Sequence, residues 1–369
     1  MSMCQWVARY RLSSDRVDHG APRRNRLLGM ATTGHDLVYI GAYTDDGVPG
    51  ITGWHRDAAT GELTAAPHGD APAADASFLA WHPNGPWLYA ASEFAGEVLT
   101  YAVAPDGALT HLGTRPTGGE PCHLSVDPSG RWVAVANYGG GSVALFEVAA
   151  DGTLEPRDLV RHTGSGLDPE RQEAPHAHLA QWLGSDLWVT DLGIDQVVRY
   201  TVVDGALHRA GAADFAAGMG PRWLAAHPDG AVFVAGELDA TVVACTVADG
   251  VLRPGPAVPA ALELPEEERT YPSHIECSAD GRFVYLANRG PDCLTVFAVA
   301  GTRLTALADV PTGGRWPRHF AQVDDLIYVA NQTGDSVTVL RVDPDTGIPV
   351  PTGAAVEVAR PACVLLPRR

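Results

Sequence analysis

Four short segments of this chain carry residue types that could perform acid–base chemistry on an anionic substrate. They are PHAH, with His176 and His178; GPRW, with Arg222; AGEL, with Glu237; and ANRG, with Arg289. Arginine offers a planar fork of donors to phosphate or carboxylate. Glutamate or histidine can act as a base near neutral pH when its surroundings tune its pKa. The set therefore suits a substrate with an anion and a carbonyl, although a buried Arg–Glu network with a purely structural role fits the same spacing.

These segments interrupt a strand pattern that occurs seven times, with a period of about 48 residues. A regular period of 40 to 50 residues rich in strand formers is typical of propeller blades. The copies are LVYIGAY from Leu37, WLYAASE from Trp87, WVAVANY from Trp132, LWVTDL from Leu187, VFVAGE ending at Glu237, FVYLANR from Phe283 and LIYVANQ from Leu326.

Each copy is accompanied by three further predicted strands, which makes a four-stranded blade. A leading strand ends in a glycine-containing turn, as in DPSG at Gly130, because glycine accepts the positive φ of tight turns. A third strand follows, and a weaker fourth one, as in DGTLEPRDL from Asp151. The first repeat lacks its leading strand, and RPACVLLP from Arg360 resembles the missing strand. We therefore predict an all-β, seven-bladed propeller over residues 36–369, a single domain closed by pairing of the C-terminal strand with the N-terminal strands.

Residues 1–35 are predicted to be a disordered extension, or the result of a start assigned too early with Met30 as the true start. The first 30 residues hold six arginines and two aspartates, and no apolar segment typical of a secretory signal. No run of 18 apolar residues occurs, so we expect no membrane span.

Composition narrows the classes of partner. The chain has 26 basic residues, all arginine, against 44 acidic ones, for a net charge of −18. The absence of lysine excludes Schiff-base chemistry, and the acidic balance argues against nucleic-acid binding and against docking on anionic membrane. The six cysteines form no C-x-x-C pair, which favours a reduced, cytoplasmic protein without a zinc site. We expect no cofactor and a monomer or weak homodimer.

The leading strands of the blades should line the central channel. Histidines recur there at positions that the spacing treats as equivalent, with other residues at the same place in the remaining blades. The histidines are His123, His178, His274 and His319, and the others are Phe78, Trp223 and Cys363. A residue that recurs in most blades serves the blade, so we interpret His123, His274 and His319 as structural and seek the site where a blade departs from the repeat. His176 and His178, two residues apart on a strand, should point to the same side.

A long segment, HTGSGLDPERQEAPHAH from His162 to His178, explains the longest interval between repeats. Its glycine, proline and charged residues favour a lid or specificity loop. A plain surface loop is the alternative.

Together, VYIGAYT, the HTGSG…RQEAPHAH loop, DLGIDQV, GPRW–HPDG and ANRG–D resemble the seven-bladed lactonase family. This family includes propeller-type 6-phosphogluconolactonases and carboxymuconate-lactonizing enzymes. The resemblance implies a metal-free site at the channel mouth, with catalytic residues at His178, Arg222, Glu237 and Arg289. The chain departs from the family at Trp223, where many relatives carry histidine, and in its lack of lysine, so that arginine must hold any phosphate.

The leading hypothesis is hydrolysis of a small anionic lactone, 6-phosphogluconolactone above all. Glu237 between two arginines is the first choice of base, with His178 as substitute because the arginines lower the pKa of the carboxyl. A lactonizing or cycloisomerase reaction on a carboxymuconate-like dicarboxylate and a non-enzymatic binding propeller are the alternatives. Predicted substrate-binding residues are His176, Arg171, Gln172, His123, His274 and Arg318.

Overall fold

The computed structural model describes residues 36–44, 49–264 and 269–367. Residues Thr33–Arg369 group into one compact unit. The prediction for residues 1–35 lies outside the described residues.

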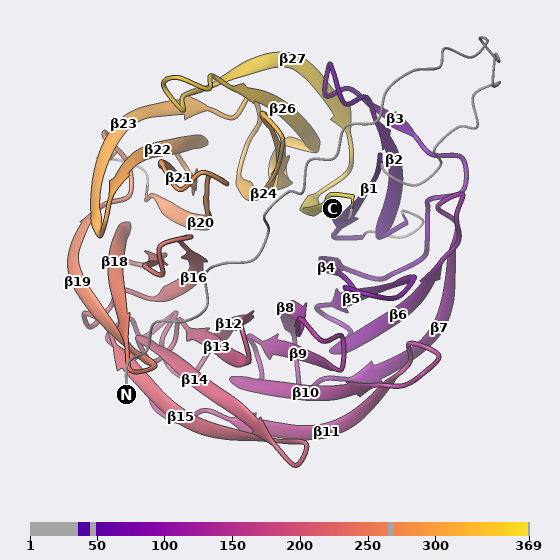
Figure 1. The fold of residues 1–369 in the computed structure, drawn as a ribbon, viewed down its shortest axis with the longest axis horizontal. Coiled ribbons are helices and arrows are strands. Elements are labelled where there is room, and N and C mark those ends of the chain that lie inside the picture. The colour runs from indigo at the N-terminus through magenta and orange to yellow at the C-terminus, as the bar shows by residue number, and fades with distance from the viewer. Residues whose placement is uncertain (1–35, 45–48, 265–268, 368–369) are drawn as a thin grey trace, which may run out of the picture. The chain divides into compact units, whose positions relative to one another are not determined.

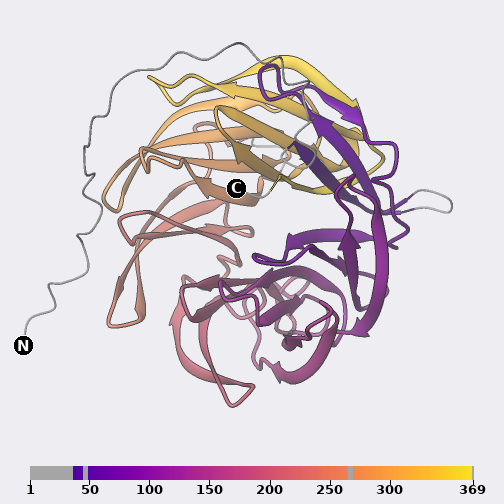
Figure 2. The ribbon, with the colours of Figure 1, turned by 45° about the vertical axis from the view of Figure 1, so that its right-hand side comes forward.

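Seven four-stranded antiparallel sheets form a ring of blades, as the repeat predicts (Figure 1). The innermost strands contact one another around the ring, from β28 through β4, β8, β12, β16, β20 and β24 back to β28. Figure 2, turned by 45°, shows neighbouring sheets side by side. We number the blades 1 to 7 in chain order and call the strand nearest the channel the inner strand.

Blade 1 is completed by both ends of the described chain. Its strands are β28 (Pro361–Leu365), β1 (Leu37–Ala42), β2 (Ile51–Arg56) and β3 (Leu63–Ala65). The C-terminal β28 pairs with β1, with Ile40 opposite Val364. The predicted ring closure is confirmed, and it pairs the side of β1 that would otherwise be an open edge.

Blades 2 to 7 each use four consecutive strands, in sequence order from the channel outward. Blade 2 holds β4 (Ala76–Trp81), β5 (Trp87–Ser92), β6 (Glu97–Val103) and β7 (Leu109–Pro116). Blade 3 holds β8 (Pro121–Val126), β9 (Trp132–Asn137), β10 (Ser142–Val148) and β11 (Leu154–Arg161). Blade 4 holds β12 (Ala177–Leu183), β13 (Asp186–Asp191), β14 (Gln196–Val203) and β15 (Ala206–Asp214).

The remaining blades repeat this plan. Blade 5 holds β16 (Pro221–Ala226), β17 (Val232–Gly236), β18 (Thr241–Ala248) and β19 (Val251–Pro259). Blade 6 holds β20 (Tyr271–Cys277), β21 (Phe283–Arg289), β22 (Cys293–Ala300) and β23 (Arg303–Pro311). Blade 7 holds β24 (Pro317–Val323), β25 (Leu326–Asn331), β26 (Ser336–Val342) and β27 (Pro349–Glu357), with a 3-10 turn, η1 (Gln332–Gly334), between β25 and β26. Within the described ranges, no helix has the length and apolar character of a membrane span.

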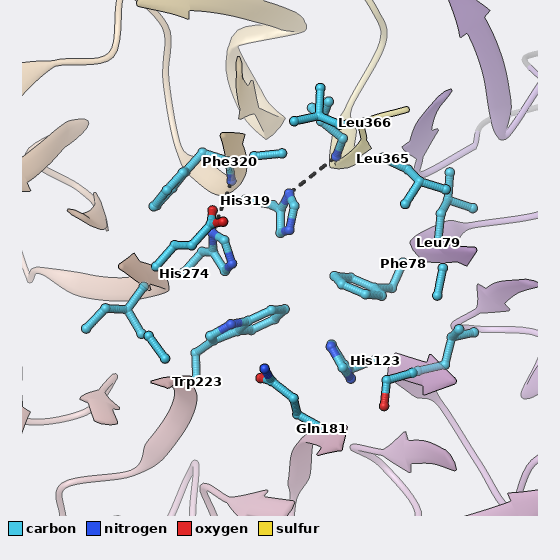
Figure 3. Close-up of a pocket in the computed structure, with 18 of the residues that line it drawn as sticks. Phe78, Leu79, His123, Gln181, Trp223, His274, His319, Phe320, Leu365 and Leu366 are labelled. Carbon is cyan, nitrogen blue, oxygen red and sulfur yellow. Dashed lines mark hydrogen bonds between the residues drawn. The ribbon is translucent and has the colours of Figure 1, made fainter. Parts of the chain in front are cut away.

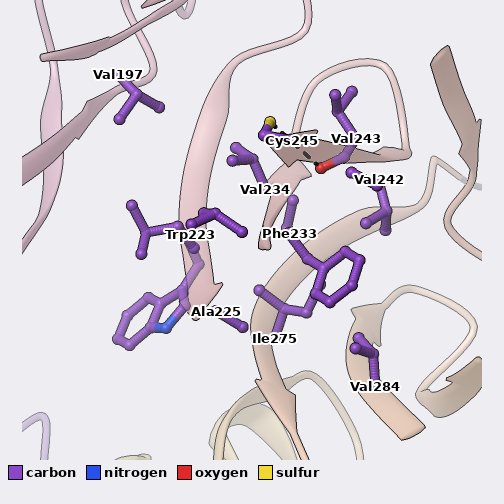
Figure 4. Packing of buried hydrophobic residues seen from close by; sticks show 14 of the residues in the cluster. Val197, Trp223, Ala225, Phe233, Val234, Val242, Val243, Cys245, Ile275 and Val284 are labelled. Carbon is purple, nitrogen blue, oxygen red and sulfur yellow. Dashed lines mark hydrogen bonds between the residues drawn. The ribbon is translucent and has the colours of Figure 1, made fainter. Parts of the chain in front are cut away.

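The core lies between neighbouring blades. Figure 4 shows one such interface, where Trp223 and Phe233 of blade 5 pack near Ile275 and Val284 of blade 6. Second strands such as β1 and β21 are buried along their whole length because sheets cover both of their faces, whereas outer strands such as β11 are mostly exposed. This explains why the second strand gives the apolar signal that repeats in the sequence.

The predicted turns are confirmed. Gly130, Gly230 and Gly281 end the hairpins between first and second strands with φ of 80°, 89° and 72°. A side chain is disfavoured in this conformation, which is why glycine recurs at this point of the repeat.

Candidate active site

Two sets of blade-equivalent residues surround one end of the channel, which we call the charged mouth. The first set lies at the register shift near the start of each inner strand: Ser77, Cys122, His178, Arg222, Ser273, Arg318 and Ala362. The second set stands at the end of each second strand: Tyr43, Glu93, Tyr138, Leu192, Glu237, Arg289 and Gln332. Because the blades repeat, residues far apart in sequence converge here by position alone.

Glu237 is the centre of the charged mouth. Its Oε2 atom lies 2.7 Å from Nε of Arg222 and 2.8 Å from Nη2 of Arg289. Its Oε1 atom accepts a hydrogen bond of 2.7 Å from Nη2 of Arg171, which comes from the loop between β11 and β12. Blades 4, 5 and 6 therefore meet at one carboxylate, as the departures from the repeat predict.

The electrostatics of Glu237 follow from this geometry. Burial alone would raise the pKa of its carboxyl, but Arg289, Arg222 and Arg171 outweigh burial and hold the pKa well below its usual range. Glu237 is therefore ionised at neutral pH and is a poor proton acceptor.

Backbone carbonyls accept hydrogen bonds from Arg222 and Arg289 and fix the positions of the two guanidiniums. Arg222 donates through Nη1 to the carbonyl of Ser273, while its Nε forms an ion pair with Glu237 without hydrogen-bond geometry. Arg289 donates from Nε to the carbonyl of Tyr271, at 3.1 Å. Burial, followed by repulsion from Arg289, lowers the pKa of Arg222 to about 9. Both guanidiniums are fixed cations at neutral pH.

His178 lies in the same electrostatic field and has an unused nitrogen. Its Nδ1 atom is buried and has no hydrogen-bond partner among the described residues. Burial, followed by Arg222, lowers the pKa of His178 well below its usual value, so the imidazole is neutral at pH 7. A buried polar atom without a partner is rare in folded proteins and calls for an explanation such as a ligand.

His176 and His178 both contact Tyr138. The ring of His176 stacks on Tyr138 with centroids 4.3 Å apart, and His178 meets the same ring edge-on at 5.8 Å. His176 also lies 3.3 Å from the carboxylate of Glu173. The two imidazoles thus share a neighbour, as their spacing predicts, but His176 is more engaged.

The long loop contributes Arg171 and is braced by Gln172. The Gln172 amide donates to the carbonyl of Leu192 and to Asp195, both at 2.8 Å, and its oxygen accepts the backbone N–H groups of Leu167 and Asp168. Gln172 is fully buried in these contacts. The structure therefore brings Arg171 into the site but places Gln172 inside the loop, where its amide is already occupied.

A second ionic group borders the charged mouth on blades 1, 2 and 7. Arg318 lies 3.5 Å from Glu93, and its guanidinium carbon lies 5.1 Å from the ring centre of Tyr43. The Tyr43 hydroxyl donates a 2.6 Å hydrogen bond to the same Glu93 oxygen. The structure thus places Arg318, a predicted substrate-binding residue, at the charged mouth, with two partners that the sequence analysis missed.

Trp316 forms part of the rim beside Arg289. Its φ of 62° is in the left-handed region, which is unusual for a bulky residue. Asp292 accepts its backbone N–H at 2.7 Å, and Gln332 donates to its carbonyl at 3.0 Å. Its ring lies 5.5 Å from the guanidinium of Arg289. The surrounding hydrogen bonds therefore hold an aromatic wall against a site arginine.

The structure corrects the predicted equivalence of His178 with the other channel histidines. A β-bulge between Ala177 and Leu179 pairs Leu179 with Thr190, just as His123 pairs with Ala136. Leu179 is therefore the blade-4 equivalent of His123, and His178 belongs to the set that contains Arg222. The Pro-based alignment failed because blade 4 begins its inner strand with alanine, which shifts the count by one residue.

His123, His274 and His319 instead close the channel below the charged mouth. Each imidazole accepts, through Nδ1, a backbone N–H of the next inner strand, from Ala180, Phe320 and Val364 respectively. These bonds support the structural interpretation of the repeated histidines. Because Nδ1 is an acceptor, each neutral ring carries its proton on Nε2. Burial, followed by the charge of His319, lowers the pKa of His123 to about 3, and burial lowers that of His319 to about 3.

These imidazoles pack with Phe78 and Trp223 into what we call the aromatic plug. The rings point toward the channel axis in Figure 3, and His123 meets Trp223 with centroids 4.9 Å apart. The plug lines a cavity of about 590 Å³ at the channel end opposite the charged mouth. The structure therefore separates His123 and His274 from the charged mouth, where they were predicted to bind substrate.

Tyr43, Glu93, Tyr138 and Trp316 are the residues that sequence reasoning missed. The first three are the last letters of the repeated strand pattern, in VYIGAY, LYAASE and VAVANY, at the same position as Glu237 and Arg289. Reading that column across all seven copies would have found them. Within the described ranges, no cluster of three or more His, Cys, Asp or Glu residues could hold a metal ion.

Comparison with known proteins identifies the class. Residues 37–366 match the family "Lactonase, 7-bladed beta-propeller", and the chain belongs to this family. It is thus a lactonase, an enzyme that hydrolyses cyclic esters.

Particular relatives are similar over nearly their whole length. The chain is 34% identical to a 6-phosphogluconolactonase of Bacillus subtilis over 89% of this chain and 97% of the relative. It is 31% identical to a 6-phosphogluconolactonase of Formosa agariphila, covering 84% and 93%. The structure of a periplasmic gluconolactonase of Pseudomonas aeruginosa superposes with a TM-score of 0.80 at 28% identity, covering 89% and 98%.

Proposed function

We propose that the charged mouth hydrolyses 6-phosphogluconolactone to 6-phosphogluconate. The observation that carries the proposal is a cluster in which three arginines hold the Glu237 carboxylate and a neutral His178 lies in their electrostatic field. The similarity to the 6-phosphogluconolactonases of Bacillus subtilis and Formosa agariphila supports the choice of substrate.

We assign the base to His178 rather than to Glu237. Both oxygens of Glu237 are engaged by guanidiniums, which hold the pKa of the carboxyl too low for it to accept a proton. His178 is neutral and has a nitrogen free to accept one. An anionic substrate beside Arg222 would weaken the repulsion that lowers the pKa of His178 and make it a better base. Glu237 then acts as a positioning residue that holds the arginines.

Hydrolysis of the lactone proceeds in two steps, addition of water and release of the ring oxygen. His178 takes a proton from water while the water oxygen bonds to the carbonyl carbon, and the carbonyl oxygen becomes an oxyanion. When the oxyanion collapses, the bond from the carbon to the ring oxygen breaks and His178 returns the proton to that oxygen. Arg222 and Arg289 are fixed donors that would stabilise the oxyanion, a contribution typically of about 3 kcal/mol per donor.

The test is hydrolysis of freshly generated 6-phosphogluconolactone, with spontaneous hydrolysis subtracted. We expect wild-type turnover, and a loss of at least about 100-fold in kcat/KM in Glu237→Gln and in Arg289→Ala. The matched surface control is Arg282→Ala, which pairs with Asp280 on an exposed turn. The absence of wild-type activity, or full activity in both site variants, would contradict the proposal.

Unphosphorylated gluconolactone is the second candidate substrate. The similarity to the gluconolactonase of Pseudomonas aeruginosa favours it. The same assay with glucono-1,5-lactone separates the two candidates, because a phosphate-directed enzyme should show a higher kcat/KM for the phosphorylated lactone.

A further inference from the structure

Arg318 is a largely buried cation whose donors are mostly unused. Its side chain is only 16% exposed, yet its guanidinium makes a single hydrogen bond to the described residues, a long one of 3.5 Å to Glu93. A guanidinium carries five N–H donors. Arg289, by contrast, donates to two backbone carbonyls and also pairs with Glu237. None of its nitrogens is both fully buried and unpartnered, so its unused donors are open to the charged mouth, where a ligand can reach them.

The neighbours of Arg318 fix its position without saturating it. The Tyr43 hydroxyl donates to Oε2 of Glu93 at 2.6 Å, which satisfies much of that carboxylate. The guanidinium lies over the Tyr43 ring at 5.1 Å, a cation–π contact that orients the planar group. Arg318 therefore presents a preorganised fork at the charged mouth.

The charge of the mouth matches a dianion. Arg171, Arg222, Arg289 and Arg318 contribute four positive charges, and Glu237 and Glu93 remove two, which leaves a balance of +2. A phosphate monoester carries a charge of about −1.5 to −2 near pH 7 and offers three acceptor oxygens. Arginine is suited to bind phosphate through two parallel bonds.

The blade positions separate Arg318 from the proposed reacting groups. His178 belongs to blade 4 and Arg222 to blade 5, whereas Arg318 belongs to blade 7 and its partners Glu93 and Tyr43 to blades 2 and 1. Three blades out of seven place Arg318 across the channel from His178. In 6-phosphogluconolactone the carbonyl belongs to the ring, whereas the phosphate is carried on C6 outside the ring, so one molecule can present the two groups to different residues of the mouth.

We propose that Tyr43, Glu93 and Arg318 form a phosphate subsite across the channel from the proposed base, His178. Arg318 binds the phosphate, and Glu93 and Tyr43 hold Arg318 in place. The inference rests on the proposed function, and it assigns specificity for the phosphorylated lactone to one arginine.

The experiment compares two lactones in three proteins. The kcat and KM values of wild type, Arg318→Gln and Arg315→Gln are measured with 6-phosphogluconolactone and with glucono-1,5-lactone. Arg315 is exposed and lies three residues from Arg318, so its variant controls for the loss of one positive charge. We expect Arg318→Gln to raise KM for the phosphorylated lactone by about 10- to 100-fold, with less than about a threefold change for the other lactone. Arg315→Gln should change neither.

The outcomes separate the subsite from the proposed function. If wild type does not prefer the phosphorylated lactone, phosphate-directed function fails and the subsite with it. If wild type prefers it but Arg318→Gln loses both activities equally, the subsite is overturned while the proposed function stands.

Direct binding provides a second measurement that does not depend on turnover. Calorimetry with 6-phosphogluconate and with gluconate should show a phosphate-dependent gain in affinity that Arg318→Gln loses and Arg315→Gln keeps. Equal affinities for the two acids in wild type would overturn the subsite.

Tyr43→Phe is a second variant, which tests the subsite even if Arg318→Gln folds poorly. It keeps the ring under the guanidinium but removes the hydroxyl that occupies Glu93, so Glu93 should draw Arg318 closer. We expect a several-fold weaker preference for the phosphorylated lactone at unchanged thermal stability. An unchanged preference would contradict the role given to Tyr43.

Discussion

The charged mouth and the aromatic plug are built from neighbouring residues of the same inner strands. Arg222 precedes Trp223, and Arg318 precedes His319. The first residue of each pair joins the ionic network, and the second points into a closed set of neutral rings. A step of one residue along a strand therefore separates two chemically opposite regions, because successive side chains project to different sides.

The two regions also differ in how they use the repeat. Three blades place histidine in the plug and make the same bond from Nδ1 to the next blade, as expected for a residue that serves the ring. The first set of the charged mouth instead includes serine, cysteine, histidine, arginine and alanine, and no residue type occurs there in more than two blades. Variation within a repeat marks the part that the fold itself does not require.

Replacing His178 by Gln should have the largest effect and test the catalytic side of this comparison. We expect kcat to fall by about 10² to 10⁴, the usual contribution of a general base. The free-enzyme pKa of His178 is held well below 6.5, so wild-type kcat/KM should be level near neutral pH and fall as protonation begins at lower pH. The variant should lose this acid limb.

His176→Gln is the control for the His178 prediction, because His176 lies two residues away beside Glu173. It should keep the acid limb of the pH–rate profile. If His178→Gln keeps the limb as well, the assignment of the base is wrong.

Replacing Glu237 by Ala should destabilise the fold by about 3–5 kcal/mol, since it leaves three close arginines without their counter-charge. Urea unfolding at pH 7 measures the change. Glu147→Ala is the matched comparison, because Glu147 also joins two arginines, Arg131 and Arg157, but at the surface. It should cost much less, because exposed ion pairs contribute little to stability. Equal costs would remove the distinction between a buried and an exposed network.

Replacing His123 by Asn should reduce the acid sensitivity of the fold. The pKa of His123 is about 3 in the folded protein, against 6.5 ordinarily, so the unfolded chain binds more protons between these values. Its contribution to stability is therefore present above pH 6.5 and is lost as pH falls toward 3, at up to about 1.4 kcal/mol per pH unit. Asparagine can still accept the Ala180 N–H but cannot be protonated there.

The free energy of unfolding from pH 7 to 4 measures the His123 effect. His208→Asn, on the exposed strand β15, should leave the slope unchanged. An unchanged slope in His123→Asn would show that the plug does not govern acid sensitivity.

Replacing Trp316 by Gly should have the smallest effect on stability and test the rim of the charged mouth. The left-handed conformation costs a non-glycine residue about 1 kcal/mol, which glycine avoids, but the contact with Arg289 is lost. Glu120, with φ of 47°, has the same position in blade 3. We expect Glu120→Gly to be the more stabilising change by thermal unfolding, and only Trp316→Gly to raise KM for the lactone. No change in KM would show that Trp316 is not part of the substrate wall.

Much of the site could be predicted because departures from a repeat are visible in one sequence. His178, Arg222, Glu237 and Arg289 were found in this way, and the structure brings their side chains into one electrostatic cluster. Gln172 could not be distinguished from Arg171 by spacing, since only the folded loop shows that its amide is consumed by Leu192 and Asp195.

The sequence alone determined the seven blades, their turns and the closure of the ring, because apolar periodicity and turn glycines act locally and recur in every blade. The tertiary structure decided which residues face the charged mouth. The register of blade 4, in which Ala177 pairs with Asp191 as Pro121 pairs with Asn137, places His178 in the set containing Arg222 and not in the predicted ring of histidines. Glu93 and Arg318, 225 residues apart, meet only when the ring closes. Strand register and the side-chain contacts between blades depend on pairing between distant segments, which no local pattern specifies.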